Sequence, residues 1–418
     1  MESQEDRIIN GLLKADVGFL TPAEAEARLS QDVVIRADPT RSGSGDLWPC
    51  IWFLAAVLER QFTGQVVIDV GLGSALPSPV PLSSRCLFIR GAGRDAGVSV
   101  SLGADEDQVV ILGDTRGNVV SYGRSIDSTH QPAHPAAACA LAGYLGFSAL
   151  AHAAGLPPFH AHWQTDRIQM PFSPHGLNLP ADFSVLGTGQ VGQAFLALAY
   201  FLHRDRPVSV HLVDRGEFEG ANLRTQVLLA GRVEDWCGRR KVDYLAEICK
   251  RWGWVPTAEK TEIGWGWKCT RPGSSIAFLG FDNMDARRVG VEAGFTHLFE
   301  CGVGTDFCRP RVSWHSLPPD RDLAKELFQS GAKRRWSKSE FAKSLGESPG
   351  ACGRVVFENI EASAPSFGLV AAAFTWAEVL SYFNGSRQPH SGSAYLWSPL
   401  LPFERSYPVP SNSQLRVA

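Results

Sequence analysis

Residues 183–203, FSVLGTGQVGQAFLALAYFLH, decide the fold of the second half of this 418-residue chain. A short apolar run turns through glycines directly into an amphipathic helix, and the next apolar run, VSVHLVD at 208–214, is typical of a following strand. A strand, a helix and a second strand within about thirty residues predict the β-α-β unit of a parallel sheet. The same α/β architecture continues in a helix at 239–253 and strands at 274–282 and 297–304.

The glycines at this strand-to-helix turn indicate a nucleotide site. Gly187, Gly189 and Gly192 form the pattern G-x-G-x-x-G, in which missing side chains let backbone amides and the helix N-terminus approach phosphate oxygens. Asp214 closes the next strand, where a carboxylate can accept hydrogen bonds from ribose hydroxyls. Phosphate and ribose together specify a nucleotide, but an ordinary nicotinamide-dependent dehydrogenase would carry the same four residues.

Polar residues farther along the chain distinguish these possibilities. They are Asn222, Gln226, Lys241, Asp282 and Asn283, a set that a dehydrogenase does not need. With them, residues 183–304 and the final apolar helix resemble the superfamily of ThiF, MoeB and the ubiquitin-activating enzymes. The pattern of that superfamily is G-x-G-x-x-G, an Asp, S-N-L-x-R-Q, a helix lysine and D-N-x-x-x-R, and Arg287 stands at the offset of the last arginine.

The resemblance implies ATP-dependent adenylation of a protein C-terminal carboxylate. The carboxylate attacks the α-phosphorus of ATP and expels pyrophosphate, so the site must supply positive charge and a metal ion. The resemblance assigns the cationic role to Lys241 and an arginine, and the Mg²⁺ ligand role to Asp282. The cofactors expected are therefore ATP and Mg²⁺, with Gly187, Gly189, Gly192, Asp214, Asn222, Gln226, Lys241, Asp282 and Asn283 at the nucleotide.

The arginine of the family motif is displaced by one residue in this chain. The family places it immediately before the glutamine, where this chain has Thr225, and the arginine here is Arg224. Arg224 is the predicted catalytic cation if a local rearrangement brings it to the nucleotide. Arg239 and Arg240 are the alternatives.

Cys352, within PGACGR, is the predicted acceptor of the activated acyl group. It lies at the end of a charged segment, 309–352, that we expect to form an insertion out of the sheet. The resemblance places the catalytic cysteine of thioester-forming members at this position on a crossover loop. Flanking glycines would expose the sulfur, and Arg354 would lower the pKa of the thiol. Cys301 and Cys308 are the rival candidates.

Residues 1–178 predict a first α/β domain and linker, and residues 179–418 the active domain. The first part alternates strand-like and helix-like runs, such as DVVIRAD at 32–38 and PCIWFLAAVLERQ at 49–61. Its glycines after QVVIDV, Gly71-x-Gly73, lack the third glycine, so we expect an inactive adenylation-like domain and an intrachain pseudo-dimer. A homodimer is also left open. In homodimeric relatives an N-terminal arginine of the partner reaches the ATP, which Arg7 or Arg28 would supply here.

The charge and cysteine content of the chain limit the classes of partner and metal that we expect. The formal charge of -3 provides no global basic field, so neither nucleic acid nor an anionic membrane is expected as the main partner. Nine cysteines lack any C-x-x-C pair, so no zinc is expected; sulfur-carrier activators commonly bind zinc through two such pairs. The resemblance therefore implies a ubiquitin-like protein as substrate and a conjugating enzyme as acceptor, as in bacterial conjugation pathways.

The sequence also predicts a cytoplasmic location. No secretory signal is readable at the N-terminus. The apolar run at 136–151 has sixteen residues, fewer than the roughly 20 that cross a bilayer.

Three alternative functions stay open at this stage. A nicotinamide-dependent oxidoreductase explains the glycines and Asp214 but leaves Lys241 and Asp282 without a role. Adenylation without a cysteine step, as in peptide or sulfur-carrier activation, predicts no thiol-sensitive conjugate. A nucleotide-binding scaffold would bind ATP without releasing pyrophosphate.

Overall fold

The protein is described from a computed structural model. The described residues are 6–15, 21–37, 47–69, 77–89, 98–102, 111–116, 119–123, 134–156, 166–169, 178–204, 206–269, 276–281, 283–304, 307, 311–318, 320–328, 343–344, 362–384, 390–396 and 398–406.

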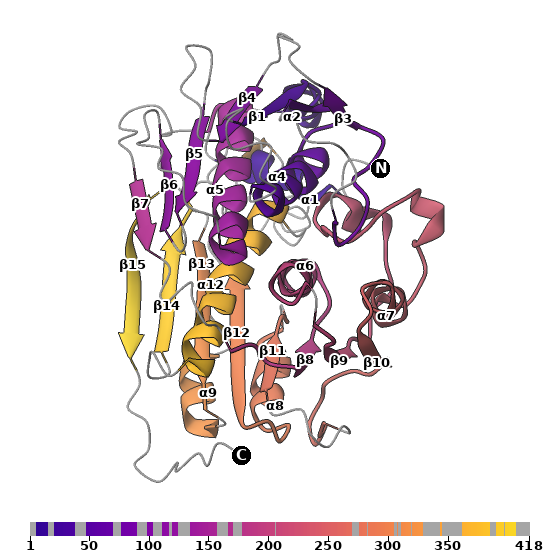
Figure 1. Ribbon diagram of the computed structural model, residues 1–418, viewed down its shortest axis with the longest axis vertical. Helices are drawn as coiled ribbons and strands as arrows, with labels where there is room; N and C mark the ends of the chain where they lie inside the picture. Colours follow the sequence, from indigo (N-terminus) through magenta and orange to yellow (C-terminus); the bar gives the residue numbers. More distant parts are fainter. Residues whose placement is uncertain are drawn as a thin grey trace.

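The described strands of the first half form a seven-stranded sheet in the order β3-β2-β1-β4-β5-β6-β7 (Figure 1). The pairs from β3 to β5 are parallel, and β6 and β7 are added antiparallel. The strands are β1 (Val33–Ala37), β2 (Val66–Asp69), β3 (Cys86–Ile89), β4 (Val98–Leu102), β5 (Ile111–Arg116), β6 (Val119–Gly123) and β7 (Asp166–Gln169).

The second half repeats this order in an eight-stranded sheet, β10-β9-β8-β11-β12-β13-β14-β15. The pairs from β10 to β12 are parallel and the last three strands are antiparallel. The strands are β8 (Asp182–Leu186), β9 (Ser209–Val213), β10 (Val255–Glu259), β11 (Ile276–Leu279), β12 (His297–Val303), β13 (Arg311–Leu317), β14 (His390–Tyr395) and β15 (Ser398–Ser406). Parallel strands joined by helices are the Rossmann-like fold expected from the sequence.

Two long helices join the halves into one hydrophobic core. Helix α5 (Pro135–Ala154) packs on the first sheet, α12 (Pro365–Phe383) packs on the second, and the two helices contact each other (Figure 1). Glycine permits their close approach, since a Cβ at Gly143 would lie 2.6 Å from Cγ2 of Val370. Within the described residues these two helices are long and apolar enough to cross a membrane by composition alone, but 89% of each apolar window is buried in the protein.

The remaining helices surround this centre. They are α1 (Arg7–Lys14), α2 (Pro22–Leu29), α4 (Trp48–Gln61), α6 (Gln190–Leu202), α7 (Lys241–Arg251), α8 (Met284–Val291), α9 (Arg321–Leu327) and the 3-10 turns η2 (Gly220–Arg224) and η3 (Val233–Asp235). Helices α4 and α6 occupy the same place in the two halves, each between the first and second strands of its sheet. The change from one sheet to the other falls between Gln169 and Asp182.

Two expectations about individual segments need correction. Gly71-x-Gly73 was expected to correspond to the glycine turn of the second half. In the strand order, the glycine turn follows the first strand of its sheet, so its counterpart in the first half is the segment 38–46 between β1 and α4, whereas Gly71 and Gly73 follow the second strand. Both segments lie outside the described residues. The segment from 309 onward was expected to leave the sheet, but β13 pairs with β12 from Val303↔Val312 to Leu298↔Leu317. An alternating burial pattern along β13 gives this strand one face in the core.

Candidate functional site

A cavity of about 1040 Å³ opens where the carboxyl ends of β8, β9 and β11 meet. Strand order reverses between β8 and β11, and such a crevice is where open α/β sheets bind ligands. The lining residues with predicted or chemical roles are Arg7, Gly187, Gly189, Asp214, Arg215, Gln226, Lys241, Glu262, Asn283, Arg287, Cys301, Arg311, Ser313, His315, Ser363 and Ser393.

The glycine turn is shaped by close backbone packing. Gly187 has φ +90°, a conformation that favours glycine, and a Cβ there would lie 2.9 Å from the Gly280 carbonyl. A Cβ at Gly192 would lie 2.2 Å from the Gly187 carbonyl oxygen. A Cβ at Gly189 would meet no atom within 4 Å, and Gly189 caps α6 with no side-chain hydrogen bond. The N-terminus of α6 therefore meets the cavity at Gly189 with open space beside it, which suits an anionic phosphate.

Asp214 ties the glycine turn to the loop that follows β9. Its Oδ2 accepts hydrogen bonds from Thr188 N at 2.7 Å and Thr188 Oγ1 at 3.0 Å, and its Oδ1 accepts one from Gly216 N at 2.7 Å. Lys241 begins α7, and its Nζ lies 3.4 Å from the position of a Cβ at Gly216. The structure therefore brings Asp214 and Lys241 together at the cavity.

Gln226 and Asn222 differ in their placement. Gln226 lines the cavity, and its Oε1 accepts a hydrogen bond from Gln193 Nε2. Asn222 is buried in η2 and is not among the cavity-lining residues; its Oδ1 accepts a hydrogen bond from Glu219 N at 3.0 Å. Asn222 thus shapes the turn that leads to Gln226.

Arg224 is not among the residues that line the cavity. Its Nη1 forms an ion pair with Asp6 Oδ2 at 3.2 Å, and its Nη2 donates to the Gln61 carbonyl at 2.9 Å. Burial lowers the pKa of Arg224, and the Asp6 carboxylate opposes that shift. The one-residue displacement in the motif directs this guanidinium to the first half of the chain, so its placement gives no support to a role at the nucleotide. The alternatives Arg239 and Arg240 pair instead with Glu247 and Asp243 on α7.

Arg7 comes to the cavity from the first half. It is the first residue of α1, lines the cavity, and accepts a hydrogen bond at its carbonyl from Ser363 N at 3.2 Å. Arg28 does not line the cavity, and its Nη1 donates to the Ala154 carbonyl. Of the two arginines considered from the sequence, Arg7 has the placement for contact with a ligand.

A buried acid lies beneath the cavity wall, and the sequence analysis did not identify it. Glu300 on β12 pairs with Arg287 Nη1 at 2.7 Å and lies 3.5 Å from His315 Nε2. Burial raises the pKa of Glu300 to about 7, and Arg287 opposes the shift. Arg287 also donates to the Phe281 carbonyl at 2.7 Å, so its guanidinium is fixed at the cavity. No local motif marks Glu300 or His315, because strand pairing brings them together.

The proposed metal ligand and acceptor cysteine cannot be placed. Asp282, Cys308 and Cys352 all lie outside the described residues. Asn283 lines the cavity but its Oδ1 accepts the Asp285 amide at 2.8 Å as the cap of α8. In the described part of the chain, no group of three or more His, Cys, Asp and Glu side chains could hold a metal ion.

Cys301 lines the cavity but is poorly suited to nucleophilic attack. Burial and the neighbouring Glu300 carboxylate raise the pKa of its thiol far above neutrality. The thiolate, rather than the thiol, is the nucleophile. This argues against Cys301 as the rival of Cys352.

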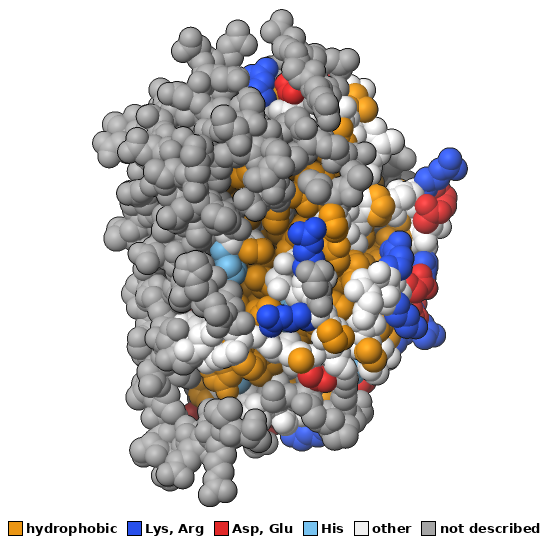
Figure 2. Space-filling model, in the orientation of Figure 1, with side chains coloured by type: hydrophobic (Ala, Val, Ile, Leu, Met, Phe, Trp, Pro, Cys, Tyr) orange, Lys and Arg blue, Asp and Glu red, His pale blue; other side chains and the backbone are white. Residues whose placement is uncertain are grey.

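Charged side chains on the face seen in Figure 2 gather along the edge that carries α7, with both signs interspersed. Two pairs, Arg239–Glu247 and Arg240–Asp243, join residues just before α7 to carboxylates on α7. Surface pairs of this kind contribute little to stability. Because each joins opposite charges, these pairs do not add a field of one sign to this surface.

These features define an α/β protein with a Rossmann-like sheet and a cavity at its switch point that several cationic side chains line. Residues 179–386 match the family model described as the BilD C-terminal domain. The chain is also 27% identical over 215 residues to the bacterial E1-like protein BilD of Collimonas sp. (strain OK412), covering 50% of this chain and 46% of that protein. The second half is therefore similar in sequence to a domain of this E1-like protein, and the chain spans about half the length of this curated relative.

Solved structures with some similarity include two of E. coli MccB. The complex with ATP is 16% identical with a TM-score of 0.37, and the complex with AMPCPP and MccA is 16% identical with a TM-score of 0.36. Each covers 54% of this chain and 63% of the other chain.

Proposed function

We propose that this protein uses ATP to adenylate the C-terminal carboxylate of a ubiquitin-like protein, which is then transferred to Cys352 and to a conjugating enzyme. The observation that carries the proposal is the cavity at the open N-terminus of α6, which Lys241, Arg287 and Arg7 line together. The homology to an E1-like protein supports the reaction class.

The residues at the cavity fit a nucleotide triphosphate. The surface at Gly189 is open and bare, so phosphate oxygens can approach the α6 amides. Asp214 Oδ1 accepts one hydrogen bond from the protein, which leaves capacity for a ribose hydroxyl. Lys241 and Arg7, which both line the cavity, neutralise phosphate charge. In this proposal Asp282 holds Mg²⁺, which offsets further negative charge on the phosphates.

The chemistry requires positioning and charge more than proton transfer. A substrate carboxylate oxygen attacks the α-phosphorus, the bond between that phosphorus and the bridging oxygen breaks, and pyrophosphate leaves with the electron pair. The Cys352 thiolate then attacks the acyl carbonyl, the carbon–oxygen bond to phosphate breaks, and AMP leaves. The thioester passes to the cysteine of a conjugating enzyme by a second exchange.

The first half serves as an inactive partner domain in this proposal. At the position of the glycine turn in its strand order, the sequence is Gly43-x-Gly45-x-x-Trp48. Helix α6 follows its N-cap Gly189 and α4 follows its N-cap Leu47, so the position of Gly192, three residues after the N-cap, is held by Cys50 in the first half. The first half therefore has no glycine at the position where Gly192 makes its close backbone contact in the second half. The chain thus works as a pseudo-dimer, in the cytoplasm, with residues 1–178 and 179–418 as the two units.

The test is incubation with ATP, Mg²⁺ and candidate ubiquitin-like proteins, followed by a non-reducing gel, mass spectrometry and a pyrophosphate assay. Wild-type protein should release pyrophosphate and form a reducible adduct. Cys352→Ala should keep pyrophosphate release and lose the adduct, while Cys237→Ala, which removes a cysteine that the structure shows as exposed, should keep both.

Each other result points to a different correction. An adduct that persists in Cys352→Ala assigns another cysteine. Pyrophosphate without any adduct removes the thioester step and leaves adenylation alone. ATP binding without pyrophosphate release, with a verified partner, favours the scaffold function.

A further inference from the structure

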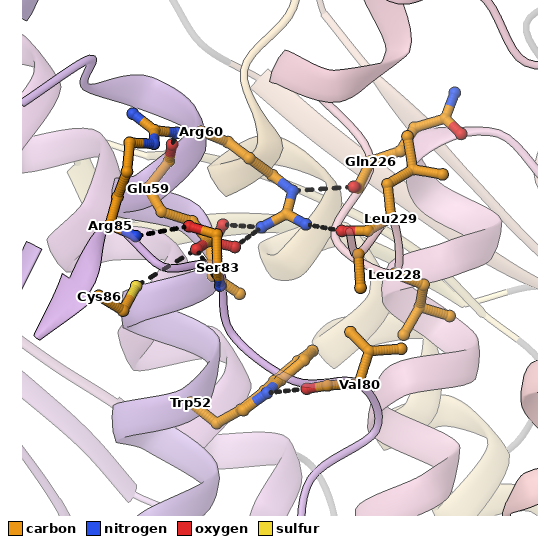
Figure 3. Close-up of polar contacts among 12 residues, drawn as sticks. Trp52, Glu59, Arg60, Val80, Ser83, Arg85, Cys86, Gln226, Leu228 and Leu229 are labelled. Atoms are coloured by element: carbon orange, nitrogen blue, oxygen red, sulfur yellow. Dashed lines mark hydrogen bonds and ion pairs between the residues drawn. The ribbon is translucent and has the colours of Figure 1, made fainter. Parts of the chain in front are cut away.

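Arg60, in the last turn of α4, connects the first half of the chain to a segment of the second half that includes the cavity-lining residue Gln226. Its Nε donates to the Gln226 carbonyl at 2.9 Å, and its Nη2 donates to the Leu229 carbonyl at 2.6 Å (Figure 3). The side chain is 4% exposed. Both acceptors belong to the segment that follows η2 in the second half.

The guanidinium is held in this orientation from its own side. Its Nη1 donates to the Ala56 carbonyl at 2.7 Å and pairs with the Glu59 carboxylate. Glu59 in turn accepts hydrogen bonds from Ser83 N at 2.9 Å and Cys86 Sγ at 3.2 Å. Burial alone would raise the pKa of Glu59, but Arg60 and these hydrogen bonds lower it, so Glu59 stays ionised. A charged, fixed donor therefore faces two backbone carbonyls.

Gln193 of α6 also holds the segment that Arg60 contacts. Gln193 Nε2 donates to Gln226 Oε1, and Gln193 Oε1 accepts the Leu228 amide at 3.1 Å. Gln193 also donates to the Thr188 carbonyl at 3.3 Å, inside the glycine turn. The side chain of Gln226 extends away from Arg60, as Figure 3 shows, and lines the cavity. Residues 226–229 are thus hydrogen-bonded both to Arg60 and to the helix that begins at the glycine turn.

We propose that Arg60 is a positioning residue by which the first half fixes residues 226–229 and places Gln226 at the cavity. The expected effect of Arg60 on ATP binding rests on the proposed function, whereas its effect on the order of residues 226–229 does not. The guanidinium addresses two carbonyls with separate donors, so lysine can replace it only in part. The first half is then required for an ordered site in addition to any residue it contributes there.

The test compares three variants of the full chain. Glu59→Gln/Arg60→Met removes both contacts to the second half and leaves no buried charge without a partner. Arg60→Lys keeps the positive charge but offers a single donor nitrogen in place of the separate nitrogens of the guanidinium. Arg85→Met is the matched control, because Arg85 borders the same cluster but donates to the carbonyls of Phe62, at 2.7 Å, and Glu59, which both belong to the first half. All are measured well below their unfolding midpoints.

Two readouts separate the inference from the proposed function. Hydrogen exchange at the Leu228 and Leu229 amides should be about tenfold faster in the double variant, intermediate in Arg60→Lys and unchanged in Arg85→Met. The dissociation constant for ATP should rise about tenfold in the same order. Unchanged exchange in the double variant, or an equal change in Arg85→Met, overturns the inference. If wild-type protein binds no ATP while exchange follows the expected order, the proposed function fails and the positioning of the loop stands.

Discussion

Gly192→Ala should destabilise the protein because the new methyl group has no space. A Cβ at this position would lie 2.2 Å from the Gly187 carbonyl oxygen and 3.2 Å from its carbon. Both are backbone atoms that cannot rotate away, so α6 or the turn must shift. Overpacking of this kind costs about 1–3 kcal/mol, and the short contact to a carbonyl places the expected loss at about 3 kcal/mol.

Gly189→Ala is the matched control, since a Cβ there meets nothing within 4 Å and φ is -73°. It should keep wild-type stability but weaken ATP binding, because the methyl group stands where phosphate would approach. Urea unfolding measures stability, and with a slope of about 3 kcal/mol per molar urea Gly192→Ala should lower the midpoint by about 1 M. Equal midpoints for the two variants would refute the packing argument. ATP binding that is unaffected by Gly189→Ala would refute the assignment of this turn to phosphate.

Three further predictions concern single charges. Arg7→Ala should weaken ATP binding about tenfold while Arg28→Ala leaves it unchanged, since Arg7 alone of the two lines the cavity; titration calorimetry tests this. Arg224→Ala should lower the free energy of unfolding by about 1–3 kcal/mol and leave ATP affinity unchanged, because the partners of Arg224 are Asp6 and the Gln61 carbonyl. A loss of ATP affinity without a loss of stability would instead assign Arg224 to the nucleotide site. Glu300→Gln should flatten the pH dependence of stability. Burial raises the pKa of Glu300 from 4.5 to about 7, so the folded state keeps a proton that the unfolded chain loses, and wild-type stability should fall by up to about 3 kcal/mol as pH rises across that window. A difference between wild type and Glu300→Gln that is constant with pH would contradict this.

Much of the parallel core could be predicted from sequence. Apolar runs bounded by turns gave β1, β2, β8 and β9, and the apolar helices correspond to α4, α5, α6 and α12. Each of these signals is local: a run of β-branched residues or a helical period. The antiparallel strands β13, β14 and β15 were not predicted, because their sequences are mixed and their pairing joins residues far apart, as in Trp314↔Gly392.

The candidate site shows the same division. Glycines and Asp214 form a local motif, and the structure places them together. The contributions of Arg7, Glu300 and Arg60 depend on contacts between distant segments or between halves, which no spacing rule reveals. Arg224 shows the opposite case, in which a motif residue displaced by one position acquires different partners.

The central claim, that the cavity binds ATP for adenylation, is tested most directly by equilibrium binding of ATP and NAD to the full chain. Lys241→Met is compared with Lys250→Met, which alters an exposed lysine on the same helix. We expect ATP to bind in preference to NAD, with affinity lowered at least about tenfold by Lys241→Met and unchanged by Lys250→Met. Preference for NAD, or ATP affinity that is indifferent to Lys241, would contradict the claim.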